Sequence, residues 1–201
     1  MTPSEQRVLA QLQAELRRVA RYDDESVVHD KWIRQRYDSG SFASFAPARA
    51  AAVRTAWHES GHAVAALAVG AGFNSASIHH SGGRRGRGSQ GRVHGVNGGT
   101  ELAFVIDAAG QIAEQLMNWT IPDSDAELRA WLAAWRSDGG DARRFRRAVA
   151  ERAGQDELGA WRHSQQLLTT RRLAIRQVAR ALLLHPRHLT YGVIAAIADA
   201  S

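Results

Sequence analysis

Apolar residues recur at helical spacing along most of the chain. Near the start, Thr2 precedes Pro3 and is followed three positions later by Glu5, which is the pattern of a helix N-terminus closed by a capping box. Apolar side chains then return every three or four residues to about position 21, which predicts a first helix. The same spacing predicts a second helix over residues 25–37, followed by a linker over residues 39–47.

The longest helical pattern covers residues 48–70, is rich in alanine and ends at Gly70 and Gly72. Residues 73–80 and 92–96 each favour a strand, and a loop of glycine and arginine separates them, so this region predicts a β-hairpin. Helical spacing returns over residues 100–118, 124–136, 141–152, 156–184 and after residue 190. The patterns predict an α+β fold, mainly α-helical, in which an N-terminal helical segment (1–46) precedes a larger domain (47–201) that ends in a helical bundle.

Composition narrows the chemistry that the chain can support. Its 201 residues include no cysteine, so a metal site would have to use histidine and carboxylate ligands. The longest apolar run, residues 63–71, is about half of the ~20 residues that a membrane-spanning helix needs. The first residues also lack the charged start and apolar stretch of a secretory signal. We therefore expect no membrane span and a cytoplasmic location.

The net charge is +6, and all but one of the 26 basic residues are arginine. Such an excess permits binding to nucleic acid or another polyanion, but the arginines are spread over the chain, and this favours a compositional bias of the genome as their origin. One cluster stands out in the loop and strand of the hairpin, and its members are candidate contacts for an acidic substrate or partner: Arg84, Arg85, Arg87 and Arg92. The alternative for these residues is a solvated loop.

Residues 58–62 read H-E-S-G-H and lie inside the long predicted helix. Histidines four positions apart lie on the same face of a helix, so His58 and His62 can bind one metal ion together. Glu59 is rotated by about 100° from His58, which places its carboxylate beside the metal rather than on it. There the glutamate can take a proton from a water that zinc activates. At the histidine and glutamate frequencies of this chain, the H-E-x-x-H pattern arises by chance in about 2% of sequences.

A catalytic zinc site needs a third protein ligand and leaves the fourth position to water. The additional histidine of metzincins is absent, because the position six residues after His62 is Ala68. The third ligand must therefore come from farther along the chain. Spacing leaves five carboxylates open: Glu101, Glu114, Asp125, Asp138 and Asp141.

Taken together, these motifs resemble the protease domain of FtsH-type zinc peptidases. Residues 58–63, H-E-S-G-H-A, are similar to the H-E-A-G-H-A motif of that family, and residues 109–114, A-G-Q-I-A-E, are similar to its G-G-R-x-A-E helix. Residues 137–141, S-D-G-G-D, resemble its T-G-A-x-N-D turn. The resemblance covers about residues 48–199 and implies a zinc metallopeptidase domain that hydrolyses peptide bonds in flexible or unfolded polypeptides.

The resemblance also implies roles for single residues. Zn²⁺ would be bound by the two histidines of the motif, with Glu59 as the general base. The third zinc ligand of the family is the aspartate that ends the turn, which is Asp141 here, with Asp138 as the alternative. Glu114 would support a ligand from behind, or would bind the metal itself as in glutamate-ligated zinc peptidases.

The chain departs from the family in features that concern its partners and one of its loops. The sequence has no G-x-x-x-x-G-K-[ST] loop, so we do not expect this chain to couple ATP hydrolysis to unfolding. Its substrates would have to be flexible already, or be delivered by a separate unfoldase or adaptor protein. FtsH-type domains form hexameric rings, and residues 1–46 are a candidate oligomerisation or adaptor element here. Residues 77–80, S-I-H-H, and the glycine and arginine loop after them are similar to the strand and I-x-P-R-G segment of the family, but the proline of that segment is absent, which leaves the course of the loop open.

A second hypothesis comes from another functional class. The chain would be a non-catalytic, zinc-stabilised module that binds a polyanion or a partner protein through its arginine-rich loop. The two hypotheses assign different importance to Glu59. A peptidase needs this carboxylate for activity, whereas a binding module would tolerate its replacement.

Overall fold

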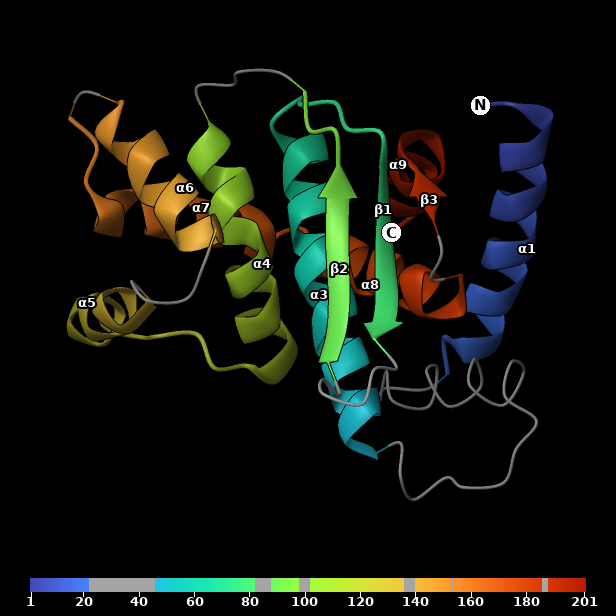
Figure 1. The fold of residues 1–201 in the computed structure, drawn as a ribbon, viewed down its shortest axis with the longest axis horizontal. Helices are drawn as coiled ribbons and strands as arrows, with labels where there is room; N and C mark the ends of the chain where they lie inside the picture. The colour runs from blue at the N-terminus through green and yellow to red at the C-terminus, as the bar shows by residue number, and fades with distance from the viewer. Residues whose placement is uncertain (22–45, 82–87, 98–101, 136–139, 153, 186–187) are drawn as a thin grey trace.

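The computed structural model describes residues 1–21, 46–81, 88–97, 102–135, 140–152, 154–185 and 188–201 (Figure 1). The helices in these ranges are α1 (Pro3–Val19), α3 (Ala46–Ala68), α4 (Ala103–Asn118), α5 (Asp125–Ala134), α6 (Gly140–Ala150), α7 (Glu157–Thr169), α8 (Arg172–Leu184) and α9 (Tyr191–Asp199). The strands are β1 (Ser75–Ser81), β2 (Gly88–His94) and β3 (Leu189–Thr190). The prediction of a mainly helical α+β fold is therefore confirmed.

Helix α3 lies at the centre of the molecule and contacts α4, α8 and both long strands (Figure 1). Small side chains make these close contacts feasible, because five of its alanines are fully buried: Ala52, Ala56, Ala63, Ala65 and Ala66. α4 comes close to α3 at Gly61, where an added Cβ would overlap the carbonyl oxygen of Ala109. Two helices that touch through alanine and glycine are held at a short, fixed separation.

The sheet is antiparallel and has the order β2-β1-β3. β1 pairs with β2 along its whole length, from Ser75 opposite His94 to Ser81 opposite Gly88. The predicted hairpin is thus confirmed, although β2 begins and ends earlier in the sequence than expected. The two-residue strand β3 pairs with Ser75 and Ala76 and was not predicted, since two residues carry no periodicity. β1 is consequently the central strand, and β2 lies at one edge.

Helices α5, α6 and α7 form a second group on the side of α4 opposite to the sheet (Figure 1). Phe145 of α6 is fully buried, with its ring centroid 5.6 Å from that of Trp135 and 5.9 Å from that of Trp161. Trp131 completes this aromatic cluster by stacking on Trp135. The cluster fixes α6 relative to α7, while α6 also packs directly on α4.

The N-terminal helix α1 begins as predicted, with a complete capping box between Thr2 and Glu5. Its buried residues Leu12, Leu16 and Val19 pack with α8 and α9, so this helix belongs to the same hydrophobic core as the rest of the chain. The predicted helix over residues 25–37 and most of the predicted linker lie outside the described residues. The division of the chain at residue 46 therefore stays a prediction.

One predicted helix is wrong in extent. Residues 156–184 form two helices, α7 and α8, rather than one, and the chain breaks between Thr169 and Arg172. The hydroxyl groups of Thr169 and Thr170 bond back to the carbonyl oxygens of Gln165 and Leu167. These hydroxyl groups compete for helix carbonyls, and β-branched side chains disfavour helix interiors, which is why the pair favours a helix end that apolar spacing alone did not reveal.

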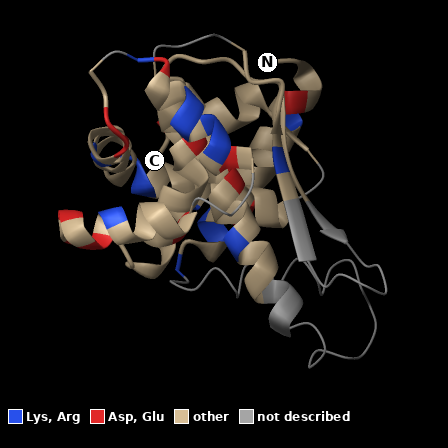
Figure 2. Cartoon of the chain, turned by 60° about the vertical axis from the view of Figure 1, so that its left-hand side comes forward, with Lys and Arg blue, Asp and Glu red and all other residues tan. Residues whose placement is uncertain are grey.

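None of the described helices is both long enough and apolar enough to cross a membrane. Basic and acidic positions occur together on several helices (Figure 2). The charge of the chain is thus distributed over the described helices as the sequence suggested.

Candidate metal centre

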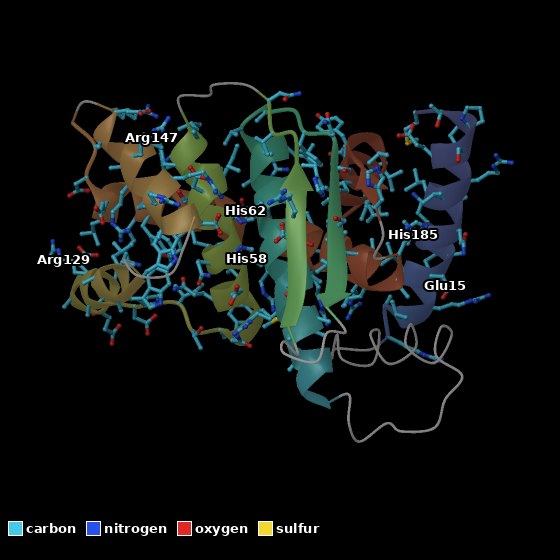
Figure 3. The ribbon with its side chains drawn as sticks, in the orientation of Figure 1. Glu15, His58, His62, Arg129, Arg147 and His185 are labelled. Atoms are coloured by element: carbon cyan, nitrogen blue, oxygen red, sulfur yellow. The ribbon has the colours of Figure 1, made fainter. Side chains whose placement is uncertain are left out.

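The fold places His58 and His62 on one face of α3, next to α4 and beneath β2 (Figure 3). Their Nε2 atoms lie 3.0 Å apart, and the two rings meet edge to face. His62 is buried and His58 is partly buried. One helical turn therefore brings two imidazole nitrogens to a common point, as the spacing predicted.

The other ring nitrogen of each histidine is held by an acceptor. His62 Nδ1 lies 2.6 Å from the carbonyl oxygen of Ile106, and His58 Nδ1 lies 2.8 Å from Oε1 of Glu114. A carbonyl or a carboxylate can only accept a hydrogen bond, so Nδ1 carries the proton in both rings. In the neutral form of a ring whose Nδ1 is protonated, the lone pair is on Nε2, so in that form both lone pairs would point at the same place. Such an arrangement favours a cation between the rings.

Asp141 brings a carboxylate oxygen to the same point as the two histidine nitrogens. It lies in the first turn of α6, and its Oδ2 is 3.1 Å from His58 Nε2 and 3.4 Å from His62 Nε2. In a tetrahedral zinc site with bonds of about 2.0–2.1 Å, the ligand atoms are separated by about 3.3 Å. The separations in this cluster are close to that value. The group of His58, His62 and Asp141 therefore has the donor types and the spacing to hold a metal ion.

The three groups also stabilise one another's charges. Burial lowers the pKa of His58, but the hydrogen bonds with Asp141 and Glu114 outweigh it and raise this pKa to about 10. Burial raises the pKa of Asp141, but hydrogen bonds from the two histidines outweigh this effect and hold the pKa well below its usual range. The cluster is thus electrostatically suited to a positive charge at its centre.

Gly110 of α4 makes room for the two histidine rings. A Cβ atom at this position would lie 2.5 Å from His58 Nε2 and 2.6 Å from His62 Nε2. The rings consequently rest directly on the backbone of α4. Gly110 falls within the segment 109–114 that resembles a motif of FtsH-type peptidases, but its contact with both rings becomes visible only in the structure.

Glu59 lies between the histidines and the edge strand. Glu59 is buried, and its carboxylate accepts a hydrogen bond from the backbone of Val93. A Cβ atom at Gly91 would overlap the Glu59 side chain. Burial raises the pKa of Glu59, while the two neighbouring histidines partly offset this shift. β2 therefore covers Glu59 closely, and glycine at position 91 permits that approach.

These groups line a cavity of about 750 Å³. Its walls come from α3, β2, α4 and α6, and they include Arg92, Ile106, Asp107 and Arg144. Arg92 is exposed at the edge strand, and no ion pair of its guanidinium is found among the described residues. The remaining members of the predicted arginine cluster, Arg84, Arg85 and Arg87, lie outside the described residues.

The other carboxylates that spacing had left open have different positions. Glu114 does not point at the centre of the cluster but supports His58 from behind. Asp125 begins α5 and bonds to Arg162 instead. Glu101 and Asp138 lie outside the described residues, so Asp138 stays an alternative ligand.

Sequence reasoning missed Asp107 and Arg144, which join the cluster from α4 and α6. Arg144 bonds to both Asp107 and Asp141. A faint signal existed, because Asp107 is the one charged residue in the apolar stretch 102–113.

Comparison with models of known protein families finds no family that matches this chain, and searches of curated proteins and of solved structures find no match either. The functional argument therefore rests on the site itself.

Proposed function

We propose that this chain is a zinc-dependent metalloendopeptidase of the kind that the FtsH-type motifs suggest. The observation that carries the proposal is the convergence of His58 Nε2, His62 Nε2 and Asp141 Oδ2, with the Glu59 carboxylate beside them in one cavity. Histidine and carboxylate ligands with this spacing suit zinc, and two histidines with one carboxylate leave a coordination position open for chemistry.

Each residue would have a defined task. His58, His62 and Asp141 would bind the ion, and Glu114 and the carbonyl of Ile106 would hold the imidazoles in the required tautomer. A bound zinc ion supplies Lewis acidity, which lowers the pKa of water and polarises a carbonyl group. Glu59 would accept the proton of the attacking water and pass it to the departing amine. Its raised pKa makes it a better proton acceptor than an exposed glutamate.

The edge of the sheet suggests how a substrate would be held. β2 is the outer strand, and residues 91–96 in and after it line the cavity. An extended polypeptide could add to this edge through backbone hydrogen bonds, which select for an unfolded segment rather than for a particular sequence. β1 offers no such edge, because it lies between β2 and β3. Arg92 at the rim would favour acidic side chains in such a substrate.

The test is metal content by elemental analysis together with cleavage of an unfolded casein-type substrate. Wild type is compared with Glu59→Gln and with the matched control Glu151→Gln, which changes an exposed glutamate of the chain. We expect stoichiometric zinc in all three proteins, and cleavage in wild type and in the control only. A chelator should abolish cleavage, and added zinc should restore it.

Other outcomes would reject the proposal. Zinc without cleavage in any of the proteins would favour the binding module, whose acidic or polyanionic partner would contact Arg92 and its neighbours. A protein without zinc would remove the metal centre on which both functions depend.

A further inference from the structure

Asp141, the third ligand of the proposed site, is held by a charged arginine side chain, whereas the two histidines are held by a carbonyl and a carboxylate. Asp141 uses its Oδ2 atom toward His58 and His62, whereas its Oδ1 atom accepts a hydrogen bond from Arg144 Nη2. The same guanidinium donates through Nε to Asp107 Oδ1 over 2.8 Å. One oxygen of Asp141 therefore faces the two histidines and the other faces Arg144. Arg144 is in turn held by Asp107.

We propose that Arg144 and Asp107 form a positioning pair that orients Asp141 for metal binding. This inference rests on the proposed function only so far as the chain binds a metal through Asp141. Arg144 would not touch the metal. Its planar guanidinium would fix the rotation of the Asp141 carboxylate, because Nε is held by Asp107 and Nη2 by Asp141.

The position of Asp107 in α4 supports this role. Its neighbour Ile106 accepts the hydrogen bond from His62, so adjacent residues of one helical turn reach two of the three ligands. The His62 contact is made by the backbone, and the Asp141 contact is made through Arg144. α4 would thus set the relative orientation of ligands that come from α3 and α6.

The arrangement joins a largely exposed arginine to two mostly buried carboxylates. The side chains of Asp107 and Asp141 are 14% and 25% exposed, whereas that of Arg144 is 58% exposed. Burial raises the pKa of Asp107, and Arg144 opposes this shift. An exposed arginine adds little to stability. Arg144 would instead act by orienting the Asp141 carboxylate. Its replacement should therefore change the metal affinity more than the stability of the fold.

The experiment measures zinc affinity by chelator competition in the full chain. We expect Arg144→Gln to weaken zinc binding about 10–100-fold, as loss of a partner behind a ligand typically does. Asp107→Asn should weaken it in the same direction, and the double variant should be no worse than Arg144→Gln, because Asp107 acts through Arg144. The absorption spectrum of the cobalt-substituted protein should change in these variants, since it reports ligand geometry.

The matched control is Arg147→Gln. Arg147 lies on the same helix but away from the histidines, pairs with Glu151 and is 80% exposed (Figure 3). It should leave zinc affinity and the cobalt spectrum unchanged. Arg144→Lys keeps the charge without the fork and should fall between wild type and Arg144→Gln. Thermal unfolding of the metal-free proteins shows whether Arg144→Gln folds. If it does not, Arg144→Lys replaces it as the test of the positioning role.

Three results would overturn the inference. These are wild-type zinc affinity in Arg144→Gln, wild-type affinity in Arg144→Lys, and additive losses in the double variant. A wild-type chain that binds zinc but cleaves nothing would reject the peptidase function alone, and the affinities of the variants would still decide the role of Arg144. A wild-type chain that binds no zinc would reject both.

Discussion

The two halves of the candidate metal centre are built from different kinds of contact. The histidine half lies between α3 and α4, where Gly61 and Gly110 let the helices and rings meet without intervening side chains. Its hydrogen bonds end on the carbonyl of Ile106 and on Glu114. The aspartate half depends on α6, and its ligand is oriented by the largely exposed Arg144.

This difference separates rigid from adjustable positioning. A close-packed helix pair changes shape only at a cost of about 1–3 kcal/mol for an added methyl group. An exposed ion pair contributes about 0–1 kcal/mol and weakens as salt increases. The histidines are therefore fixed by the fold itself, whereas the aspartate is fixed by charged side chains near the surface. A steric overlap in the helix packing of the first half should abolish metal binding, whereas loss of a charged contact in either half should reduce the metal affinity by degrees.

The largest effect is expected for Gly110→Ala, which attacks the histidine half. The new methyl group would overlap both Nε2 positions, so the rings must turn away and metal binding should be lost. Alanine raises helix propensity by about 1 kcal/mol over glycine, which offsets part of the overlap. The thermal unfolding temperature should therefore fall only moderately, and zinc titration is the decisive measurement.

Gly72→Ala is the matched control for this variant, because no atom lies within 4 Å of an added Cβ there. It should bind zinc like wild type. Tight zinc binding by Gly110→Ala would show that the histidine half can adjust, and the contrast between the two halves would then be wrong.

A smaller effect is expected for Asp141→Asn, which removes the charged ligand but keeps the shape of the side chain. Two histidines remain, so weak binding should persist, and the affinity should fall by more than the ~10–100-fold that loss of a supporting partner costs. Asp138→Asn is the comparison that decides between the two aspartates of the turn. Equal zinc affinity of Asp141→Asn and wild type, together with a loss in Asp138→Asn, would transfer the third ligand to Asp138.

The contrast also explains what the sequence could predict about the site. His58 and His62 follow from helical periodicity, because two residues of one helix keep a fixed relation whatever the rest of the fold does. Asp141 was reached only through a resemblance to a known family, since nothing local relates residue 141 to residue 62. Asp107 and Arg144 were missed, because their contact depends on how α4 and α6 pack.

Contacts between segments far apart in the sequence also limited what could be predicted about the fold. The capping box at Thr2 and the hairpin were predicted, since each is defined by neighbouring residues. The sheet order was not, because β3 is only two residues long and joins β1 from the far end of the chain. The break between α7 and α8 depends on two threonine hydroxyl groups, which apolar spacing does not register.

The smallest expected effect is that of Glu114→Gln, which tests the support behind His58. Glutamine keeps an oxygen that can accept the Nδ1 proton of His58, so the tautomer should survive, but the negative charge that strengthens the ligand is lost. We expect zinc affinity to fall about 10-fold, at the lower end of the range for such partners. Arg54→Gln is the control, because Arg54 lies 3.9 Å from Glu114 Oε2 and is 65% exposed, so its removal should leave the affinity unchanged. A loss in Glu114→Gln as large as that in Asp141→Asn would mean that Glu114 binds the metal itself, and the histidine half would then contribute a third ligand of its own.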